Sequence, residues 1–297
     1  MPDRAIQPSP LRGILLFVSG LLLFASMDTT GKYLAAHYDV PLIVAARYLG
    51  NLMLMLALLA PRHGLALMRT RRTGLVIIRA LCLAVTSILV GFALQRMPVA
   101  ETTAINFLAP MLVVVVAGPV LGEKVGRVGW GAALFGFIGV LVIVRPGSGL
   151  ETVGVICALA GVVAGVGYQL LSRVLVATES TIALLFYTAL TGSIIFGLAL
   201  PWFWTGEQPS AFEALLFLSL GVYGGLGHFL ITAAYRHAPA SLLAPTNYLQ
   251  LVWAGLLGWL VFGHLPDRIS LLGMAMIALS GVAVALHSRF QPVKRDL

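Results

Sequence analysis

Long apolar segments, separated by short connections, fill almost the whole chain of 297 residues. About 20 apolar residues cross the hydrocarbon core of a bilayer as a helix, and ten segments are long enough to do so. We predict spans at residues 12–36, 41–60, 74–95, 99–121, 127–144, 152–172, 180–203, 212–235, 240–262 and 269–287. The connections contain helix breakers such as Pro61, Pro98 and Pro146. The pattern predicts an all-α integral membrane protein with ten transmembrane helices.

One stretch, residues 93–122, recurs 141 positions later at residues 234–263. The offset pairs identical residues, as in Pro98 with Pro239, Asn106 with Asn247 and Gly122 with Gly263. It serves four separated segments, which indicates an internal repeat. We therefore divide the chain into two five-helix halves, 1–146 and 147–297. Five is an odd number, so the second half enters the membrane inverted, an arrangement that recurs in transporters whose substrate site lies between the halves.

Composition supports the membrane assignment. The chain is 59% hydrophobic and only 10% charged, with a mean hydropathy of +0.97, whereas soluble domains carry roughly 25% charged residues. The net charge of +8 comes from basic residues between apolar runs and at the ends, where they orient helices against an anionic leaflet. We therefore expect a lipid bilayer and no nucleic acid as partner. Cys82 and Cys157 lie inside predicted spans and are interpreted as small apolar residues.

Lysine and arginine counts predict the orientation. With the N-terminus inside, the inner segments hold thirteen basic residues and the outer helix ends hold four, which are Lys32, Arg96, Arg145 and Arg268. Basic residues favour the cytoplasmic side. We therefore predict cytoplasmic termini and a multi-pass protein of a bacterial inner membrane. The first apolar run is longer than that of a cleavable signal and is interpreted as the first membrane helix.

Polar residues at membrane depth are costly, so each is a candidate for function. Asn106 lies about 12 Å along the fourth span at 1.5 Å per residue, and Asn247 is its counterpart from the other side. Their amides could bind the charged groups of an amino acid, or form an interhelical hydrogen bond. Asp28 is the one carboxylate well inside a span. It could hold a substrate ammonium, carry a coupling proton or pair with Arg47 at similar depth.

Aromatic residues at depth could form a wall for a flat or apolar side chain, or serve as packing. From this group we select Tyr168, Tyr248 and Trp253. Three other polar residues receive structural interpretations or remain open. Arg79 is expected to snorkel or to cap a neighbouring helix. Glu101 could orient helices or contact arriving substrate, and His228 is expected to be hydrogen-bonded filler.

Three segments resemble the drug/metabolite transporter superfamily, in its ten-helix EamA-type branch. They read ALQRMPVAETTAINFLAP (93–110), LGEKV (121–125) and GFIGVLVIVRP (136–146). The resemblance implies two inverted five-helix halves around a central cavity. Within the branch, the chain is most similar to bacterial aromatic amino acid exporters. In those proteins the fourth helix carries a Glu and then Asn-aromatic-Leu-x-Pro.

The resemblance also implies site residues. Asn106, Phe107 and Pro110 match the motif of the fourth helix, and Tyr248 matches a tyrosine near the middle of the ninth. Two departures concern the side-chain pocket, because Ala109 and Gly165 stand where large aromatic residues can sit in such exporters. Smaller residues there predict a roomier cavity. In the second half, Gly263-His264 replaces a common Gly-Glu pair.

The sequence thus favours a secondary transporter, expected to export amino acids or similar small metabolites by alternating access. Efflux of drugs or quaternary cations and metabolite uptake stay open as alternatives. A membrane-embedded transferase would need paired carboxylates, a metal cluster or a nucleophile with its base, and no HExxH or DxxxD pattern occurs. A channel would show polar faces along several helices, whereas these spans contain isolated polar residues. We expect no catalytic residues, metal or cofactor, and a monomer or weak dimer.

Overall fold

The computed structural model describes residues 10–121, 127–204, 206, 208–238, 242–243 and 246–290, and these residues form helices and connections without a strand. The first half contains α1 (Pro10–Leu34), α2 (Val40–His63), the short 3-10 helix η1 (Gly64–Met68), α3 (Thr73–Arg96), α4 (Val99–Asn106), α5 (Leu108–Leu121) and α6 (Arg127–Ile143). The second half contains α7 (Thr152–Leu175), α8 (Thr181–Phe203), α9 (Ala211–Ala234), α11 (Leu249–Phe262) and α12 (Arg268–Phe290).

The predicted all-helical membrane fold is confirmed. Six of the described helices are long and apolar enough to cross a membrane by length and composition, namely α1, α2, α3, α7, α8 and α9. Shorter apolar helices occupy the remaining spans, at Val99–Val113, Arg127–Ile143, Leu249–Phe262 and Arg268–Ala283. The fourth span is irregular at Phe107, where α4 ends and before α5 begins at Leu108.

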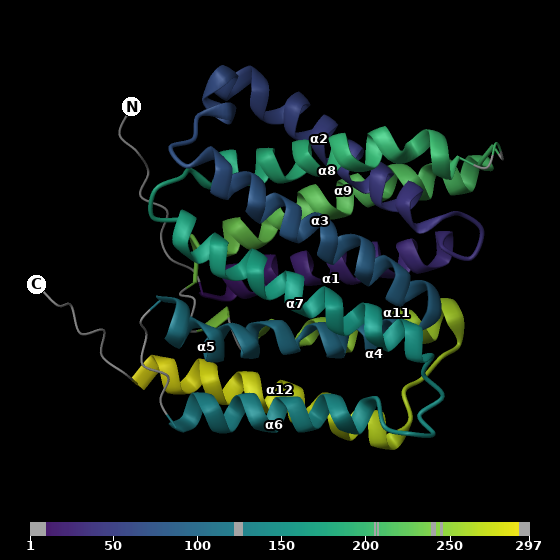
Figure 1. Cartoon of the computed structure of the whole chain (residues 1–297), viewed down its shortest axis with the longest axis vertical. Coiled ribbons are helices and arrows are strands. Elements are labelled where there is room, and N and C mark those ends of the chain that lie inside the picture. The colour runs from purple at the N-terminus through teal and green to yellow at the C-terminus, as the bar shows by residue number, and fades with distance from the viewer. Residues whose placement is uncertain are drawn as a thin grey trace, which may run out of the picture.

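The helices lie side by side and alternate in direction (Figure 1). One end of the bundle, here called the terminal face, holds the start of α1 at Pro10 and the end of α12 at Phe290. The opposite end, here called the far face, holds the end of α1 at Leu34 and the start of α7 at Thr152. α1 and its repeat partner α7 therefore begin on opposite faces, as inverted halves require.

Helix packing follows the repeat. α3 packs on α7, and the 141-residue offset converts this pair into α9 on α1, which also pack closely. The offset also carries α2 onto α8 and α6 onto α12. The two helices of each of these pairs are in contact with one another. The offset carries α5 (Leu108–Leu121) onto α11 (Leu249–Phe262) residue for residue. This is the contact pattern of a pseudo-twofold axis between two inverted halves.

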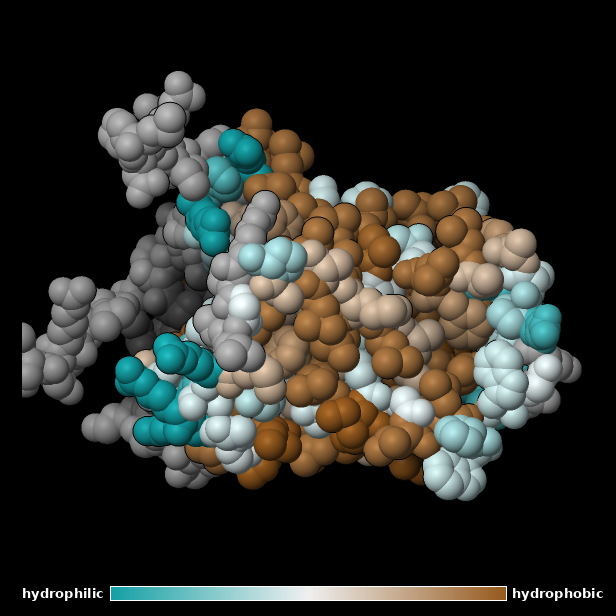
Figure 2. All heavy atoms as spheres, turned by 90° about the horizontal axis from the view of Figure 1, so that it is seen from above, coloured by the Kyte–Doolittle hydropathy of each residue, from teal (hydrophilic) through white to brown (hydrophobic). Residues whose placement is uncertain are grey.

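Apolar side chains cover the outside of the bundle as well as its core. Figure 2 shows a broad hydrophobic band between more polar ends. Leu198 and Val163, for example, are each 69% exposed, which suits contact with lipid. Inside, helices approach closely where both lack a side chain. A Cβ atom on Gly221 of α9 would lie 2.6 Å from the Cα atom of Gly50 of α2, so these helices touch backbone to backbone.

Candidate functional site

The fourth span breaks at the motif that the sequence singled out. α4 ends at Asn106, and the amide of Phe107 divides its hydrogen bond between the carbonyl oxygens of Thr103, at 3.1 Å, and Ala104, at 3.2 Å. Pro110 explains the break, because it has no N–H to offer the carbonyl of Asn106 and its ring crowds that carbonyl. Irregular backbone at membrane depth is a feature of transporter binding sites.

The ninth span is irregular at the equivalent position. α11 begins at Leu249. Just before it the hydrogen bonding is that of a turn, because the amide of Leu251 donates to the carbonyl of Tyr248, only three residues earlier, at 3.1 Å. The rings of Phe107 and Tyr248 lie 5.0 Å apart between centroids and are tilted by 35°. The structure therefore brings the two helix breaks of the two halves into direct contact.

Tyr248 is held from the other side by α12. A Cβ atom on Gly281 would lie 1.3 Å from the Tyr248 Oη atom, so the ring occupies space that only a glycine leaves. Phe107 is 6% exposed, while Tyr248 is half-buried. Asn106 and Asn247 adjoin this ring pair in sequence and are also half-buried. Among the described residues, no hydrogen bond joins the two Asn side chains to each other.

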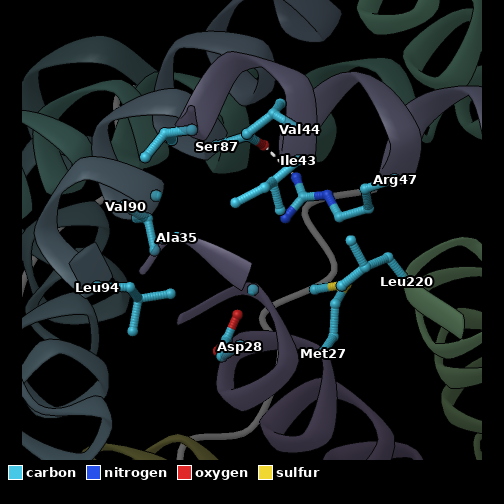
Figure 3. Close-up of a pocket in the computed structure, with 13 residues that line it drawn as sticks. Met27, Asp28, Ala35, Ile43, Val44, Arg47, Ser87, Val90, Leu94 and Leu220 are labelled. Carbon is cyan, nitrogen blue, oxygen red and sulfur yellow. Dashed lines mark hydrogen bonds between the residues drawn. The ribbon is translucent and has the colours of Figure 1, made fainter. Parts of the chain in front are cut away.

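Asp28 and Arg47 lie at a second position, a cavity of about 40 Å³ lined by residues of α1, α2, α3 and α9. Figure 3 shows the Asp28 carboxylate pointing into this cavity from α1 and the Arg47 guanidinium entering it from α2. Arg47 donates a hydrogen bond to the Ser87 hydroxyl of α3, which also pairs with the Tyr48 hydroxyl at 2.8 Å. The other walls are apolar, including Met27, Ile43, Val44, Val90, Leu94 and Leu220.

The direct Asp28–Arg47 pair considered from the sequence does not form. Among the described residues, no ion pair within 4.0 Å joins them, although the charge of Arg47 acts on Asp28 across the cavity. The reason is the hydrogen bond to Ser87, which holds the guanidinium on the α3 side. The two opposite charges face the same small cavity instead of closing it.

Tyr168 belongs to a third group, centred on Arg79. Arg79 is 4% exposed and makes four hydrogen bonds to α7 and α8. Its acceptors are the Tyr168 hydroxyl at 2.8 Å, the Ser172 hydroxyl at 2.6 Å, the Leu184 carbonyl at 3.1 Å and the Thr188 hydroxyl at 2.9 Å. The guanidinium also lies 4.4 Å from the centre of the Tyr168 ring. Arg79 does not snorkel. It ties three helices together, and it uses the Tyr168 hydroxyl to do so.

The remaining candidates lie elsewhere. Trp253 packs against a core formed by α1 and α9 residues, including Phe17 and Leu21, and its buried Nε1 finds no acceptor among the described residues. His228 is in edge contact with the Phe24 ring, 4.9 Å between centroids. The seven residues selected from the sequence therefore do not form one cluster. Phe107 and Tyr248 are in ring contact, while Tyr168, Asp28 and Trp253 lie in three other groups.

The two small residues expected to widen the pocket lie next to one another. A Cβ atom on Gly165 of α7 would stand 3.7 Å from the Ala109 Cβ atom of α5, which is ordinary van der Waals contact. Ala109 is 5% exposed and Gly165 is buried. The small side chains of Ala109 and Gly165 therefore let α5 and α7 approach closely at this point.

The far face carries a polar group that the sequence reasoning did not assemble. Glu101 of α4 is 3% exposed, and its Oε1 atom lies 3.1 Å from the His264 Nε2 atom, while its buried Oε2 atom has no described partner. Lys32 of α1 acts electrostatically on Glu101 and donates hydrogen bonds to the carbonyls of Leu94 and Met97, both at 2.8 Å. The sequence offered one indication of this group, because His264 replaces the Glu that is common at this position in the family.

Two inverted helical halves, broken helices that meet between them and charged groups held at membrane depth define a membrane transporter rather than an enzyme. The chain belongs to the EamA-like transporter family, whose model matches it twice, at residues 11–145 and 152–286.

Named relatives carry small metabolites. The chain is 27% identical over 277 residues to the pseudopaline exporter CntI of Pseudomonas aeruginosa (strain UCBPP-PA14), covering 92% of this chain and 95% of that protein. It is 25% identical over 285 residues to the S-adenosylmethionine uptake transporter of Rickettsia felis, covering 96% of each. A solved crystal structure with 20% identity has a TM-score of 0.66 and covers 93% of this chain and 98% of its own, which supports the fold alone.

Proposed function

We propose that this protein is a secondary transporter that exports amino acids or similar small metabolites across the bacterial inner membrane by alternating access. The observation that carries the proposal is the contact of Phe107 and Tyr248, where the broken fourth and ninth spans meet between the halves. Breaks at membrane depth expose backbone groups that can bind a small polar substrate. The two halves, 1–146 and 147–297, would rock about this point.

The names of the relatives support a small-molecule substrate, but they disagree on direction, since one is an exporter and the other an uptake transporter. The latter's substrate, S-adenosylmethionine, is a derivative of an amino acid. Export is favoured here by the resemblance to bacterial exporters. The orientation, with cytoplasmic termini, follows from the basic residues grouped at the terminal face, such as Arg71, Arg72, Arg173 and Arg236.

Counterflow in proteoliposomes tests the proposal. Vesicles are preloaded with single unlabelled amino acids, and separately with lipophilic cations, and the uptake of labelled compound is followed. Acceleration by amino acids supports the proposal, and the rank order of side chains reports the effect of Ala109 and Gly165. A response to cations alone would instead favour the alternative of cation efflux, and Asp28 would then be the first residue to substitute.

Two substitutions test the position of the site. We expect Asn106→Ala and Tyr248→Ala to reduce the initial rate of counterflow at least tenfold, because each removes a group at the meeting point of the breaks. Folded yield, measured by size-exclusion chromatography in detergent, should stay near that of the wild type. Normal kinetics in both variants would reject this location for substrate binding.

A further inference from the structure

The internal repeat relates the Arg79 group to the Asp28 cavity, position by position. Arg79 bonds residues 168, 172, 184 and 188. Subtracting 141 gives positions 27, 31, 43 and 47, and adding 141 to 79 gives position 220. These five counterparts all line the Asp28 cavity, and they are Met27, Gly31, Ile43, Arg47 and Leu220. The molecule therefore contains two pseudo-equivalent sites, each built from residues of both halves.

The two sites differ in how they are filled. At the Arg79 site the long Arg79 side chain of α3 meets the hydroxyls of Tyr168 and Ser172 on α7. At the Asp28 cavity Leu220 of α9 takes the place of Arg79, and Gly31 of α1 takes the place of Ser172. Because these side chains are shorter, a cavity of about 40 Å³ remains, which is room for roughly three water molecules.

The two guanidinium groups also differ in how far they are satisfied. Arg79 makes four hydrogen bonds within the protein. Arg47 makes one with the described residues, to Ser87, and its guanidinium lies 5.1 Å from the centre of the Tyr48 ring and lines the cavity. Asp28 accepts none from a described residue and points into the same cavity (Figure 3). Unpaired charges at membrane depth are costly and usually mark function.

We propose that Asp28 and Arg47 bind the ammonium and carboxylate groups of a zwitterionic amino acid, or of a metabolite that carries this group, while the apolar walls contact its side chain. This inference rests on the proposed function and adds the groups that recognise the substrate. Arg47 can bind a carboxylate through two parallel N–H donors, and Asp28 can accept from an ammonium. A bound amino acid needs more than 40 Å³, so the cavity must widen for it to enter.

The apolar walls indicate the probe. Met27, Val90, Leu94 and Leu220 suit an unbranched apolar side chain, so L-methionine is the reference ligand. Two analogues each lack one charge: the decarboxylated amine of methionine keeps the ammonium, and its deaminated acid keeps the carboxylate. Equilibrium binding of the three is measured on purified protein in detergent for the wild type, Arg47→Gln, Asp28→Asn and Arg79→Gln.

The wild type should bind methionine at least tenfold more tightly than either analogue. Arg47→Gln should weaken methionine binding at least tenfold and abolish the preference for methionine over the amine, while keeping the preference over the acid. Asp28→Asn should weaken methionine binding at least tenfold and abolish the preference for methionine over the acid, while keeping the preference over the amine. Arg79→Gln removes the guanidinium of the pseudo-equivalent site and is the matched control, so it should leave both preferences unchanged. Ratios within one variant do not depend on the fraction of protein that is folded.

Three results would overturn the inference: a wild type without preference among the ligands, equal losses for all three ligands in Arg47→Gln and Asp28→Asn, or unchanged preferences in both. Equal losses would mean that the two charges only support the fold. Counterflow separates this failure from that of the proposed function. Counterflow by amino acids with unchanged preferences rejects the Asp28–Arg47 site alone, while selective binding without any counterflow rejects transport and retains the site.

Discussion

At the scale of single residues, the neighbours of a buried charge decide its role. Arg47 and Arg79 are the two arginines that the sequence places within spans. Arg79 donates to hydroxyl and carbonyl oxygens on α7 and α8, so its charge is spread over groups that the protein itself supplies. Arg47 faces a cavity. The same side chain is therefore a structural tie in one site and a candidate ligand-binding group in the other.

Arg79 should matter for stability. We expect Arg79→Gln to lower the free energy of unfolding by about 1–3 kcal/mol, because four hydrogen bonds to a charged group are lost and the cost of burying that charge is relieved. Thermal unfolding in detergent, followed by tryptophan fluorescence, measures the effect. The control is Arg268→Gln, since Arg268 is exposed. A melting temperature equal to that of the wild type would show that the Arg79 group does not hold α3 to α7 and α8.

Gly281 should control the position of Tyr248. A methyl group at position 281 would overlap the Tyr248 hydroxyl, so Gly281→Ala must displace the ring that meets Phe107. We expect counterflow to fall at least tenfold with little change in folded yield. Gly131→Ala serves as the control, because a Cβ atom there meets nothing within 4 Å. If both variants transport at the same rate, the position of the Tyr248 ring is not important for transport.

At the scale of elements, the break between α4 and α5 is a built feature of the fourth span. Pro110 cannot donate to the Asn106 carbonyl, and a proline within a helix costs up to ~3 kcal/mol. We expect Pro110→Ala to let the span become continuous, raising thermal stability while slowing counterflow. Pro201→Ala, in the last turn of α8, is the control. A Pro110→Ala variant that is less stable than the wild type and transports normally would contradict this account.

Much of the helical framework could be predicted from the sequence, because apolar length alone marks a span. The prediction for residues 74–95 agrees with α3 at Thr73–Arg96. The break in the fourth span was also present in the sequence, as Pro110. The ninth span has Leu251 at the position of Pro110 and carries its own proline at position 245. Its helix breaker therefore lies outside the register of the repeat, and the repeat alone does not find it.

The candidate site was predicted only in part, since depth in the membrane can be read from sequence but helix rotation cannot. Depth placed Asp28 level with Arg47, and both line one cavity. The hydrogen bond that holds Arg47 apart from Asp28 comes from Ser87 on a third helix. Tyr168 likewise lies at a suitable depth but turns toward Arg79. Which face of a helix meets which neighbour is settled by packing across the whole bundle.

At the scale of the whole molecule, ion pairs join the two halves at the far face. Arg96 lies 3.2 Å from Glu151, and Arg145 lies 2.8 Å from Asp267. Glu101 and His264 form a third contact of this kind. Each has one member in residues 1–146 and the other in residues 147–297. The proposed alternating-access movement would have to separate these partners to open the far face, so the contacts favour the arrangement of the two halves in this structure.

The Arg145–Asp267 pair gives a prediction with a defined pH range. Hydrogen bonds from the Ser270 amide and from Arg145 hold the pKa of the Asp267 carboxyl below its usual value of 3.8. Because the pKa is depressed, the carboxylate stabilises the folded state at every pH above the ordinary carboxyl range. This stabilisation is lost only as the pH falls through the lower folded-state pKa. Between pH 5 and pH 8 the pair should therefore be fully charged and unchanged.

We expect Asp267→Asn to expose the Asp28 cavity from the far face more often. A cysteine at position 94, which lines that cavity, is introduced after Cys82 and Cys157 are replaced by alanine, and its reaction with a membrane-impermeant maleimide is timed. The rate should rise roughly twofold over the parent, a modest factor because the pair is exposed, and by the same factor at pH 5 and pH 8. Arg268→Gln removes a neighbouring charge and should leave the rate unchanged. An unaltered rate in Asp267→Asn would mean that the far face is closed by packing alone, while a ratio that changes between pH 5 and pH 8 would assign the closure to another titrating group.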